Sequence, residues 1–141
     1  MKVKVLACAV TLLCLISLAA PTSHACECRS IGSPRKELKK ASAVFVGEVV
    51  EAGVGGSSSR YKFRVERYWK GVREEYIIIS VGYGLCARPF TVGQKWLVYA
   101  FDYEKEGLTS DVCTRTKRLT VADDDLKALG KGKTIKKPDA H

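Results

Sequence analysis

The chain has 141 residues, of which 46% are hydrophobic, and a formal net charge of +9. These residues are too few for more than one ordinary domain plus a processed segment. The excess of basic residues permits weak attraction to anionic glycans, to a membrane surface or to acidic proteins. The alternative is a solvated basic surface without a partner, which the mixing of acids with bases along the chain favours. We predict no nucleic-acid partner.

Residues 1–25 have the pattern of a signal peptide. Two lysines precede an apolar run from Val5 to Ala20, and Ser23 and Ala25 supply the small residues that signal peptidase requires, so cleavage is predicted before Cys26. A membrane anchor is the alternative, but the run is shorter than the roughly 20 residues that span a bilayer. We therefore expect a secreted, extracellular chain (periplasmic or in the cell envelope if bacterial) whose mature part spans no membrane.

Four cysteines would remain after this cleavage: Cys26, Cys28, Cys86 and Cys113. An even number in an exported chain of this size predicts two disulfides. A bond between Cys26 and Cys28 would close a very tight ring, so each is expected to pair with a distant cysteine, and both long-range connectivities stay open. A four-cysteine zinc site is the competing interpretation. The Cys-x-Cys spacing and the oxidising compartment disfavour it.

A short helix, a strand and a loop are predicted next along the chain. Ser33 suits the N-cap of a helix over residues 34–41. Residues 43–50 are apolar and rich in β-branched side chains, which predicts a strand, and Gly47 within it suggests a bulge. The glycines and serines of residues 53–59 predict a flexible hairpin loop.

The clearest pattern in the chain is the alternation of Tyr61, Phe63 and Val65 with charged residues. This alternation predicts a half-buried strand with one face in water. Three further strands are predicted from their branched and aromatic residues, over residues 76–81, 94–101 and 108–113.

A helix is predicted over residues 121–129, with Thr120 as its N-cap, Asp123 at its third position and Gly130 as its stop. The lysine-rich residues 131–141 predict a flexible basic tail. Five strands at short spacing with one helix after them indicate an all-β fold with flanking helices. We expect a five-stranded antiparallel barrel plus a C-terminal helix.

Several short motifs carry a resemblance to a known family by their order and spacing. They are Cys26-Glu27-Cys28, Ala43–Val49, Phe63–Val65, Trp69-Lys70-Gly71, Cys86, Trp96–Ala100, Cys113–Thr116 and Ala122–Leu129. Together they are similar to the inhibitory N-terminal domain of the tissue inhibitors of metalloproteinases, within the netrin-like superfamily. The similarity covers residues 26–130, which we interpret as one netrin-like domain.

The resemblance implies an OB-fold-like barrel with Cys26 bridged to Cys86 and Cys28 bridged to Cys113. It also implies inhibition of zinc metalloendopeptidases of the matrix metalloproteinase type. In such inhibitors the first cysteine, here Cys26, binds the zinc of the target protease through its α-amino group and its carbonyl oxygen. The residue after it, here Glu27, enters the specificity pocket of the protease.

The same resemblance suggests a second contact with the protease. Three residues come just before Cys86, and the implied disulfide would place them beside the N-terminus. A plain connection between strands is the alternative for this segment. The predicted inhibitory residues are Cys26, Glu27, Cys28, Tyr83, Gly84 and Leu85.

The chain departs from the family pattern at Glu27, where the well-known animal inhibitors generally carry a small hydroxyl residue. A carboxylate in an apolar pocket, close to the catalytic glutamate of the protease, costs desolvation and like-charge repulsion. The third disulfide of the inhibitory domain and the six-cysteine C-terminal subdomain are also missing. These departures predict a minimal inhibitor with weakened action on typical matrix-type enzymes.

Nothing in the sequence indicates an enzyme. Cleavage before Cys26 would leave His141 as the only histidine, and the chain has no Ser/His/Asp set, HExxH motif or glycine-rich phosphate loop. We expect no enzymatic activity and no cofactor. Two alternatives to inhibition stay open: a netrin-like binding module for glycans or a protein partner, and an envelope protein that is lipid-anchored at Cys26.

Overall fold

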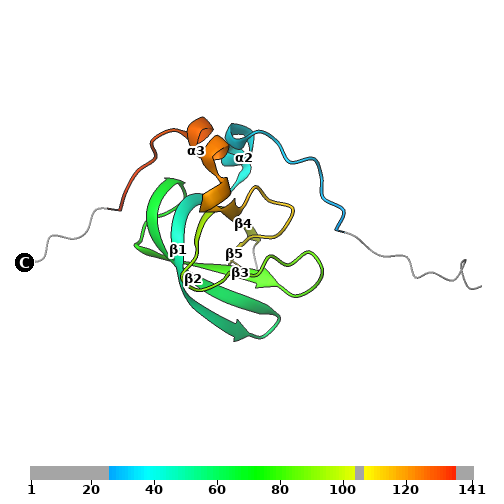
Figure 1. The fold of residues 1–141 in the computed structure, drawn as a ribbon. Helices are drawn as coiled ribbons and strands as arrows, with labels where there is room; N and C mark the ends of the chain where they lie inside the picture. Colours follow the sequence, from blue (N-terminus) through cyan, green and yellow to red (C-terminus); the bar gives the residue numbers. More distant parts are fainter. Residues whose placement is uncertain (1–25, 104–106, 136–141) are drawn as a thin grey trace, which may run out of the picture.

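The computed structural model describes residues 26–103 and 107–135, so the predicted signal peptide lies outside the described residues. Strands wrap into a barrel, and two short helices lie together at one end of it (Figure 1). The elements are α2 (Pro34–Lys40), β1 (Ala43–Gly55), β2 (Ser58–Lys70), β3 (Tyr76–Gly82), β4 (Lys95–Tyr103), β5 (Gly107–Thr109), β6 (Lys117–Arg118), η1 (Leu119–Val121) and α3 (Asp123–Leu129).

The barrel closes through five strands, because β1 pairs with both β2 and β4 while β5 joins β3 to β4. Four of the five pairings are antiparallel, and the pairing of β3 with β5 at Ser80 and Thr109 is parallel. The predicted five-stranded, OB-fold-like barrel is therefore confirmed, but it is mixed and not antiparallel. An odd number of strands in a closed ring cannot alternate in direction everywhere, so one neighbouring pair has to run parallel.

The β1–β2 hairpin is longer than the sequence predicts. Residues 53–55 and 58–59, expected in a loop, belong to the two strands, and Gly53 pairs with Arg60. Gly56 and Ser57 form the turn, and Gly56 has φ +59°, a conformation that glycine adopts without strain. The register shifts beside Gly47, as expected for a bulge, and a side chain there would lie 2.9 Å from the carbonyl oxygen of Arg64.

Aromatic rings fill the interior of the barrel. Phe63 of β2 packs edge-to-face against Phe45 and Phe90, and Phe90 packs against Trp96, with ring centroids 4.9–5.5 Å apart. Such pairs add to the stabilisation that comes from area burial. Phe90 lies in the connection between β3 and β4, where the sequence predicts no core residue, whereas the predicted inward-facing residues of β2 are all buried.

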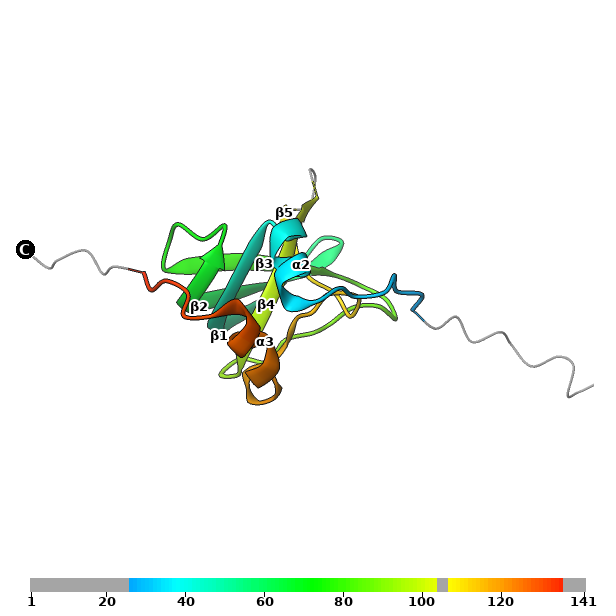
Figure 2. The same cartoon turned by 90° about the horizontal axis from the view of Figure 1, so that it is seen from above.

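A second apolar cluster lies between the barrel wall and the two helices. It contains Val44 and Tyr99 from the strands, together with Leu38 of α2 and Leu126 of α3. Figures 1 and 2 show both helices against the same part of the barrel. Strands β1 and β4 are thus covered on both faces, which explains why their sequences are continuously apolar and do not alternate. No helix in the described part of the chain is long and apolar enough to cross a membrane.

The helix boundaries follow the sequence only in part. Helix α2 begins at Pro34 after the N-cap Ser33, as predicted, although the Ser33 side chain makes no capping hydrogen bond. Helix α3 begins at Asp123 with Ala122 as its N-cap, so the prediction of Thr120 as N-cap is wrong. A 3₁₀ turn occupies residues 119–121, and the helix begins where three consecutive aspartates favour the positive end of its dipole.

The strand predicted over residues 108–113 is shorter in the structure, because β5 ends at Thr109. Asp111 then folds the chain into a turn: its carboxylate accepts a hydrogen bond from the backbone N–H of Cys113 at 2.8 Å. Residues 110–113 therefore leave the sheet and carry Cys113 toward the N-terminal segment.

The predicted tail begins with a docked segment. Lys133 exchanges two backbone hydrogen bonds with Tyr68, at 2.7 and 2.8 Å, and Ile135 packs against the barrel core. Residues 131–135 are therefore attached to the barrel, and residues 136–141 lie outside the described residues.

Candidate functional site

Two disulfides hold the N-terminal segment to the barrel. Cys26 is bonded to Cys86 and Cys28 to Cys113, with Cα atoms 5.5 and 5.1 Å apart. These are the pairings that the resemblance implies, and they leave no thiolate for a four-cysteine zinc site. Glu27 lies exposed between the two bonded cysteines, while Cys26 is half-buried. A segment that would otherwise fray is thus fixed on both sides of one residue.

The loop after β3 lies beside this segment, because Cys86 belongs to it. Tyr83 and Leu85 in this loop have exposed fractions of 60% and 80%, high values for large apolar side chains. Gly84 between them has φ +124°, and its carbonyl accepts a hydrogen bond from the N–H of Ala87 at 3.1 Å. We call residues 26–28 and 83–86 together the N-terminal ridge. The structure brings all six predicted inhibitory residues together in it.

A second attachment holds the chain at Gly32, four residues after Cys28. The N–H of Gly32 donates to Oε1 of Glu37 at 3.0 Å, and its carbonyl accepts from the guanidinium of Arg115 at 2.8 Å. Glu37 is buried and also accepts from Lys40 at 2.9 Å. The hydrogen bond from Lys40, aided by that from Gly32, outweighs burial and lowers the pKa of Glu37.

Arg115 connects this attachment to a buried carboxylate on α3. Its guanidinium donates two hydrogen bonds to Asp125, at 2.6 and 3.0 Å, and Lys117 donates a third. The hydroxyl of Tyr99 lies 3.4 Å from the same carboxylate. Arg115 follows Cys113 by two residues, so this cluster fixes the loop that carries the second disulfide.

The charges in this cluster alter one another's protonation. Burial opposes the charged form of Asp125, but the hydrogen bonds from Arg115 and Lys117 outweigh it and hold the pKa of Asp125 below its usual value. Burial, together with the nearby Asp125 charge, raises the pKa of the Tyr99 hydroxyl. Asp125 therefore stays ionised at neutral pH, and Tyr99 stays protonated.

Sequence reasoning missed the roles of Gly32, Arg115 and Asp125. A signal for Asp125 was present, since it shares a helical face with Ala122 and Leu129, which are three residues before it and four after it. An acid on an apolar helix face needs a buried partner. The pattern contains nothing that identifies Arg115 as that partner, because the two residues belong to different elements.

Replacing Gly32 by alanine is expected to lower the free energy of unfolding by about 1 kcal/mol, since a Cβ there would lie 2.6 Å from Oε1 of Glu37 and break a partly buried hydrogen bond. Amide exchange in residues 26–33 should accelerate as well. Gly53→Ala is the matched control, because no atom lies within 4 Å of its added Cβ. Equal effects of the two changes would contradict this role of Gly32.

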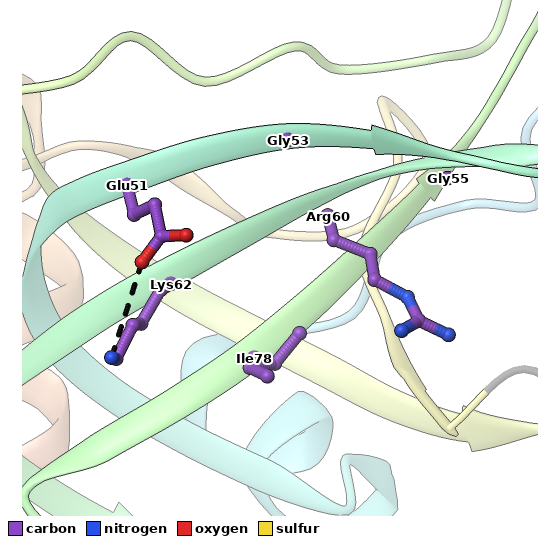
Figure 3. A pocket seen from close by; sticks show the side chains of 6 residues that line it. All are labelled: Glu51, Gly53, Gly55, Arg60, Lys62 and Ile78. Atoms are coloured by element: carbon purple, nitrogen blue, oxygen red, sulfur yellow. Dashed lines mark ion pairs between the residues drawn. The ribbon is translucent and has the colours of Figure 1, made fainter.

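The structure contains two hollows of interest. One, of about 220 Å³, lies beside the ridge and is lined by residues that include Tyr83, Cys86 and Tyr103. The other, of about 390 Å³, lies on the outer wall of β1–β3, where Arg60 points away from the ion pair of Glu51 and Lys62 (Figure 3). Within residues 26–103 and 107–135, no group of three or more His, Cys, Asp or Glu is placed to hold a metal ion.

The structure thus defines a disulfide-bonded, OB-fold-like barrel with an N-terminal ridge fixed at its edge. No protein-family model matches the chain, and a search of the curated proteins finds no similar protein. The fold, the two disulfides and the ridge are therefore the features on which a function has to be based.

Proposed function

We propose that this protein is a secreted inhibitor of zinc metalloendopeptidases that binds the zinc of its target through Cys26. The observation that carries the proposal is the arrangement of Cys26-Glu27-Cys28. Two disulfides on either side of an exposed residue present this segment at the edge of a rigid barrel. The resemblance to the inhibitory domain of the tissue inhibitors of metalloproteinases supports the same function.

The chemistry at Cys26 suits a catalytic zinc. Such a zinc has three protein ligands and an open position that holds water. After cleavage before Cys26, the amine and carbonyl of that residue can form a five-membered chelate and displace this water. An α-amino group has an ordinary pKa of about 7.7–8.0, so it loses its proton to a metal at little cost near neutral pH.

Because the ridge is already ordered, binding to a protease would cost less conformational entropy. A free peptide has to be ordered when it enters a protease cleft, whereas the disulfides and the Gly32 attachment order residues 26–32 in advance. The exposed side chains of Tyr83 and Leu85 provide apolar surface beside the chelating residue. Exposed apolar groups next to a rigid anchor are typical of a protein interface.

The proposed secreted location follows from the cleavage that zinc binding by Cys26 requires. A free amine at Cys26 exists only after residues 1–25 are removed, which is the cleavage that the signal-peptide pattern predicts. The two disulfides are consistent with an oxidising compartment.

The proposal is tested by measuring inhibition with the secreted chain. Its intact mass should correspond to residues 26–141 with two disulfides and no acyl group. This chain should then inhibit at least one enzyme in a panel of zinc endopeptidases competitively and with one-to-one stoichiometry, but leave a serine protease unaffected. A correctly processed and folded chain that inhibits no member of the panel would overturn the proposal, and an acylated Cys26 would favour the lipid-anchored alternative.

Glu27 is expected to decide which proteases are inhibited. Glu27→Gln removes the charge and keeps the size, so it should lower the inhibition constant about tenfold for an enzyme with an apolar specificity pocket. For an enzyme whose pocket contains a cation, the same change should raise the constant. Because Glu27 is exposed, the thermal midpoint should not change. Unchanged constants for both enzymes would show that Glu27 does not enter the pocket.

A further inference from the structure

A third hollow, of about 480 Å³, lies where β4 begins and β6 ends. Strand β6 pairs with β4 at two positions, Leu97 with Lys117 and Trp96 with Arg118. Beyond the second pair the chain turns into η1, so the residues before Trp96 and those after Arg118 do not pair with one another. The hollow occupies this fork and shares no lining residue with the N-terminal ridge. It is lined by Gly93, Gln94, Lys95, Arg118, Leu119 and Thr120.

Arg118 supplies this hollow with a cation that has no ion pair among the described residues. The other lining cation, Lys95, lies 2.7 Å from Oε1 of Glu66 and is neutralised by it. The Arg118 side chain is exposed, and its guanidinium carbon lies 5.8 Å from the centroid of the Trp96 ring, within reach of a cation–π contact. This contact restricts the guanidinium before any ligand binds and leaves its N–H groups available to an anion.

Gln94 supplies the hollow with a buried acceptor. Its side-chain oxygen, Oε1, accepts no hydrogen bond from any described residue. The backbone of Gln94 is held on both sides, because its N–H donates to Thr91 at 3.1 Å and its carbonyl accepts from Val49 at 3.0 Å. A buried acceptor without a donor raises the free energy of the fold, and a ligand with an N–H group would remove that cost.

The acceptor and the cation lie close together, with an apolar residue beside them. Gln94 comes two residues before Trp96, the pairing partner of Arg118, which corresponds to about 7 Å along a strand. Leu119 also lines the hollow and is partly buried against the cluster between the barrel and the helices. A concave surface with apolar residues and a few polar groups is typical of a ligand site.

From these three groups we infer that the hollow binds the C-terminal residue of a polypeptide whose last side chain is apolar. The carboxylate of that residue would pair with Arg118, because the two arms of a guanidinium match two carboxylate oxygens. Its N–H would donate to Oε1 of Gln94, and its side chain would pack on Leu119. Capture of a C-terminal carboxylate is a recurring mode of peptide recognition.

Other anions match fewer of these groups. A fatty acid has a carboxylate and an apolar chain, but it has no N–H to donate to Gln94. Inorganic phosphate has no apolar part to pack on Leu119, and its second negative charge has no second cation to pair with, because Lys95 is already paired with Glu66. The C-terminal end of a polypeptide supplies the anion, the donor and the apolar group together.

The experiment follows the backbone and indole N–H signals of the isotope-labelled mature chain by NMR during titration with an acetylated tripeptide that ends in leucine. The signals of residues 93–96 and 118–120 should shift and saturate. The same tripeptide with a C-terminal amide should bind at least tenfold more weakly, because it has lost the charged acceptor. Isocaproate, which is leucine without its nitrogen, and inorganic phosphate should also bind at least tenfold more weakly.

Two substitutions test the assigned contacts. Arg118→Gln should weaken tripeptide binding about tenfold, and Arg118→Lys should restore only part of the loss, because an ammonium does not bind two carboxylate oxygens side by side. Gln94→Leu should reduce the affinity for the tripeptide to that for isocaproate. The matched control is Arg60→Gln, which removes an exposed arginine from the barrel wall (Figure 3) and should weaken binding less than twofold.

Several outcomes would overturn the inference. They are the absence of a saturable shift at these residues, equal affinities for the acid and amide tripeptides, and binding of isocaproate or phosphate as tight as that of the tripeptide. Equal losses in Arg118→Gln and Arg60→Gln would also overturn it, since they would indicate attraction to net charge alone. The ligand comparison uses the unaltered chain, so it decides the matter even if a variant fails to fold. No protease takes part, so none of these results depends on the proposed inhibition.

Discussion

One alanine added before Cys26 should raise the inhibition constant for a susceptible zinc endopeptidase at least a hundredfold, which corresponds to about 2.8 kcal/mol. The added residue converts the amine of Cys26 into an amide, which does not bind zinc as a neutral amine does. The new terminal alanine also has no thiol, so no disulfide positions it as the Cys26–Cys86 bond positions Cys26. Progress curves of peptide hydrolysis at increasing inhibitor concentration measure the effect.

The fold of the extended chain serves as the internal control. Cys26 is only half-buried and the alanine is added outside both disulfide loops, so the extension should change neither the thermal midpoint nor the two disulfides. Intact mass before and after reduction measures the disulfides. Undiminished inhibition by a correctly folded extended chain would show that the amine is not the zinc ligand. The function would then have to reside elsewhere on the barrel.

Asp125→Asn is expected to cause the largest loss of stability among single substitutions of a charged residue, about 3 kcal/mol. The asparagine fits the same space, but it leaves the guanidinium of Arg115 and the ammonium of Lys117 without their anion. Both cations retain some contact with water, which keeps the loss at the lower end of the range for buried pairs. Urea unfolding at pH 7 measures it.

The difference in the free energy of unfolding between the unaltered chain and Asp125→Asn depends on pH with a definite sign. Because the pKa of Asp125 is lower in the folded chain than in the unfolded chain, its contribution is present above the unfolded value of about 3.9. It is lost as the pH falls below that value through the lowered pKa. The stability gap between the unaltered chain and Asp125→Asn should therefore narrow in acid.

Asp124→Asn provides the control on the same helix. Asp124 is exposed and forms no ion pair with any described residue, so its replacement should cost less than about 1 kcal/mol and should not change the acid response in the same way. If both substitutions had the same effect, the helix dipole would explain the loss, and the buried cluster would not.

Local patterns predicted the strands well, and what they missed depends on tertiary contacts. The alternation around Phe63 predicted which face of that strand is buried, and the apolar run at residues 43–50 predicted a strand. The covering of this second strand on both faces is visible only in the structure. The glycines at residues 53–55 indicated a loop because glycine has low strand propensity, yet they continue β1 through backbone pairing with β2. Thr120 is a good N-cap in isolation, but the 3₁₀ turn before α3 places the helix start at Asp123.

The candidate site, too, could be predicted from the sequence only in part. Cys26 and Cys28 are conspicuous in the sequence because of their chemistry and their position after an apolar leader. The resemblance supplied the connection of Tyr83 and Leu85 to them, since nothing local links residue 26 to residue 86. The attachment at Gly32 depends on Arg115, 83 residues away, and contacts of that kind are not encoded in any local pattern.

The lengths of the two disulfide loops determine when, during synthesis, the N-terminal segment can be fixed to the barrel. Cys28 precedes its partner Cys113 by 85 residues, so the N-terminus is made first and fixed late. During synthesis, Cys26 and Cys28 cannot form these bonds until residues 86 and 113 have been made. A chain interrupted before Cys113 would lack the Cys28–Cys113 bond and the Arg115 that holds Gly32, so the Cys26–Cys86 bond alone would attach its N-terminal segment. The ridge is therefore completed only after nearly the whole domain has emerged, which ties the proposed inhibitory activity to the finished fold.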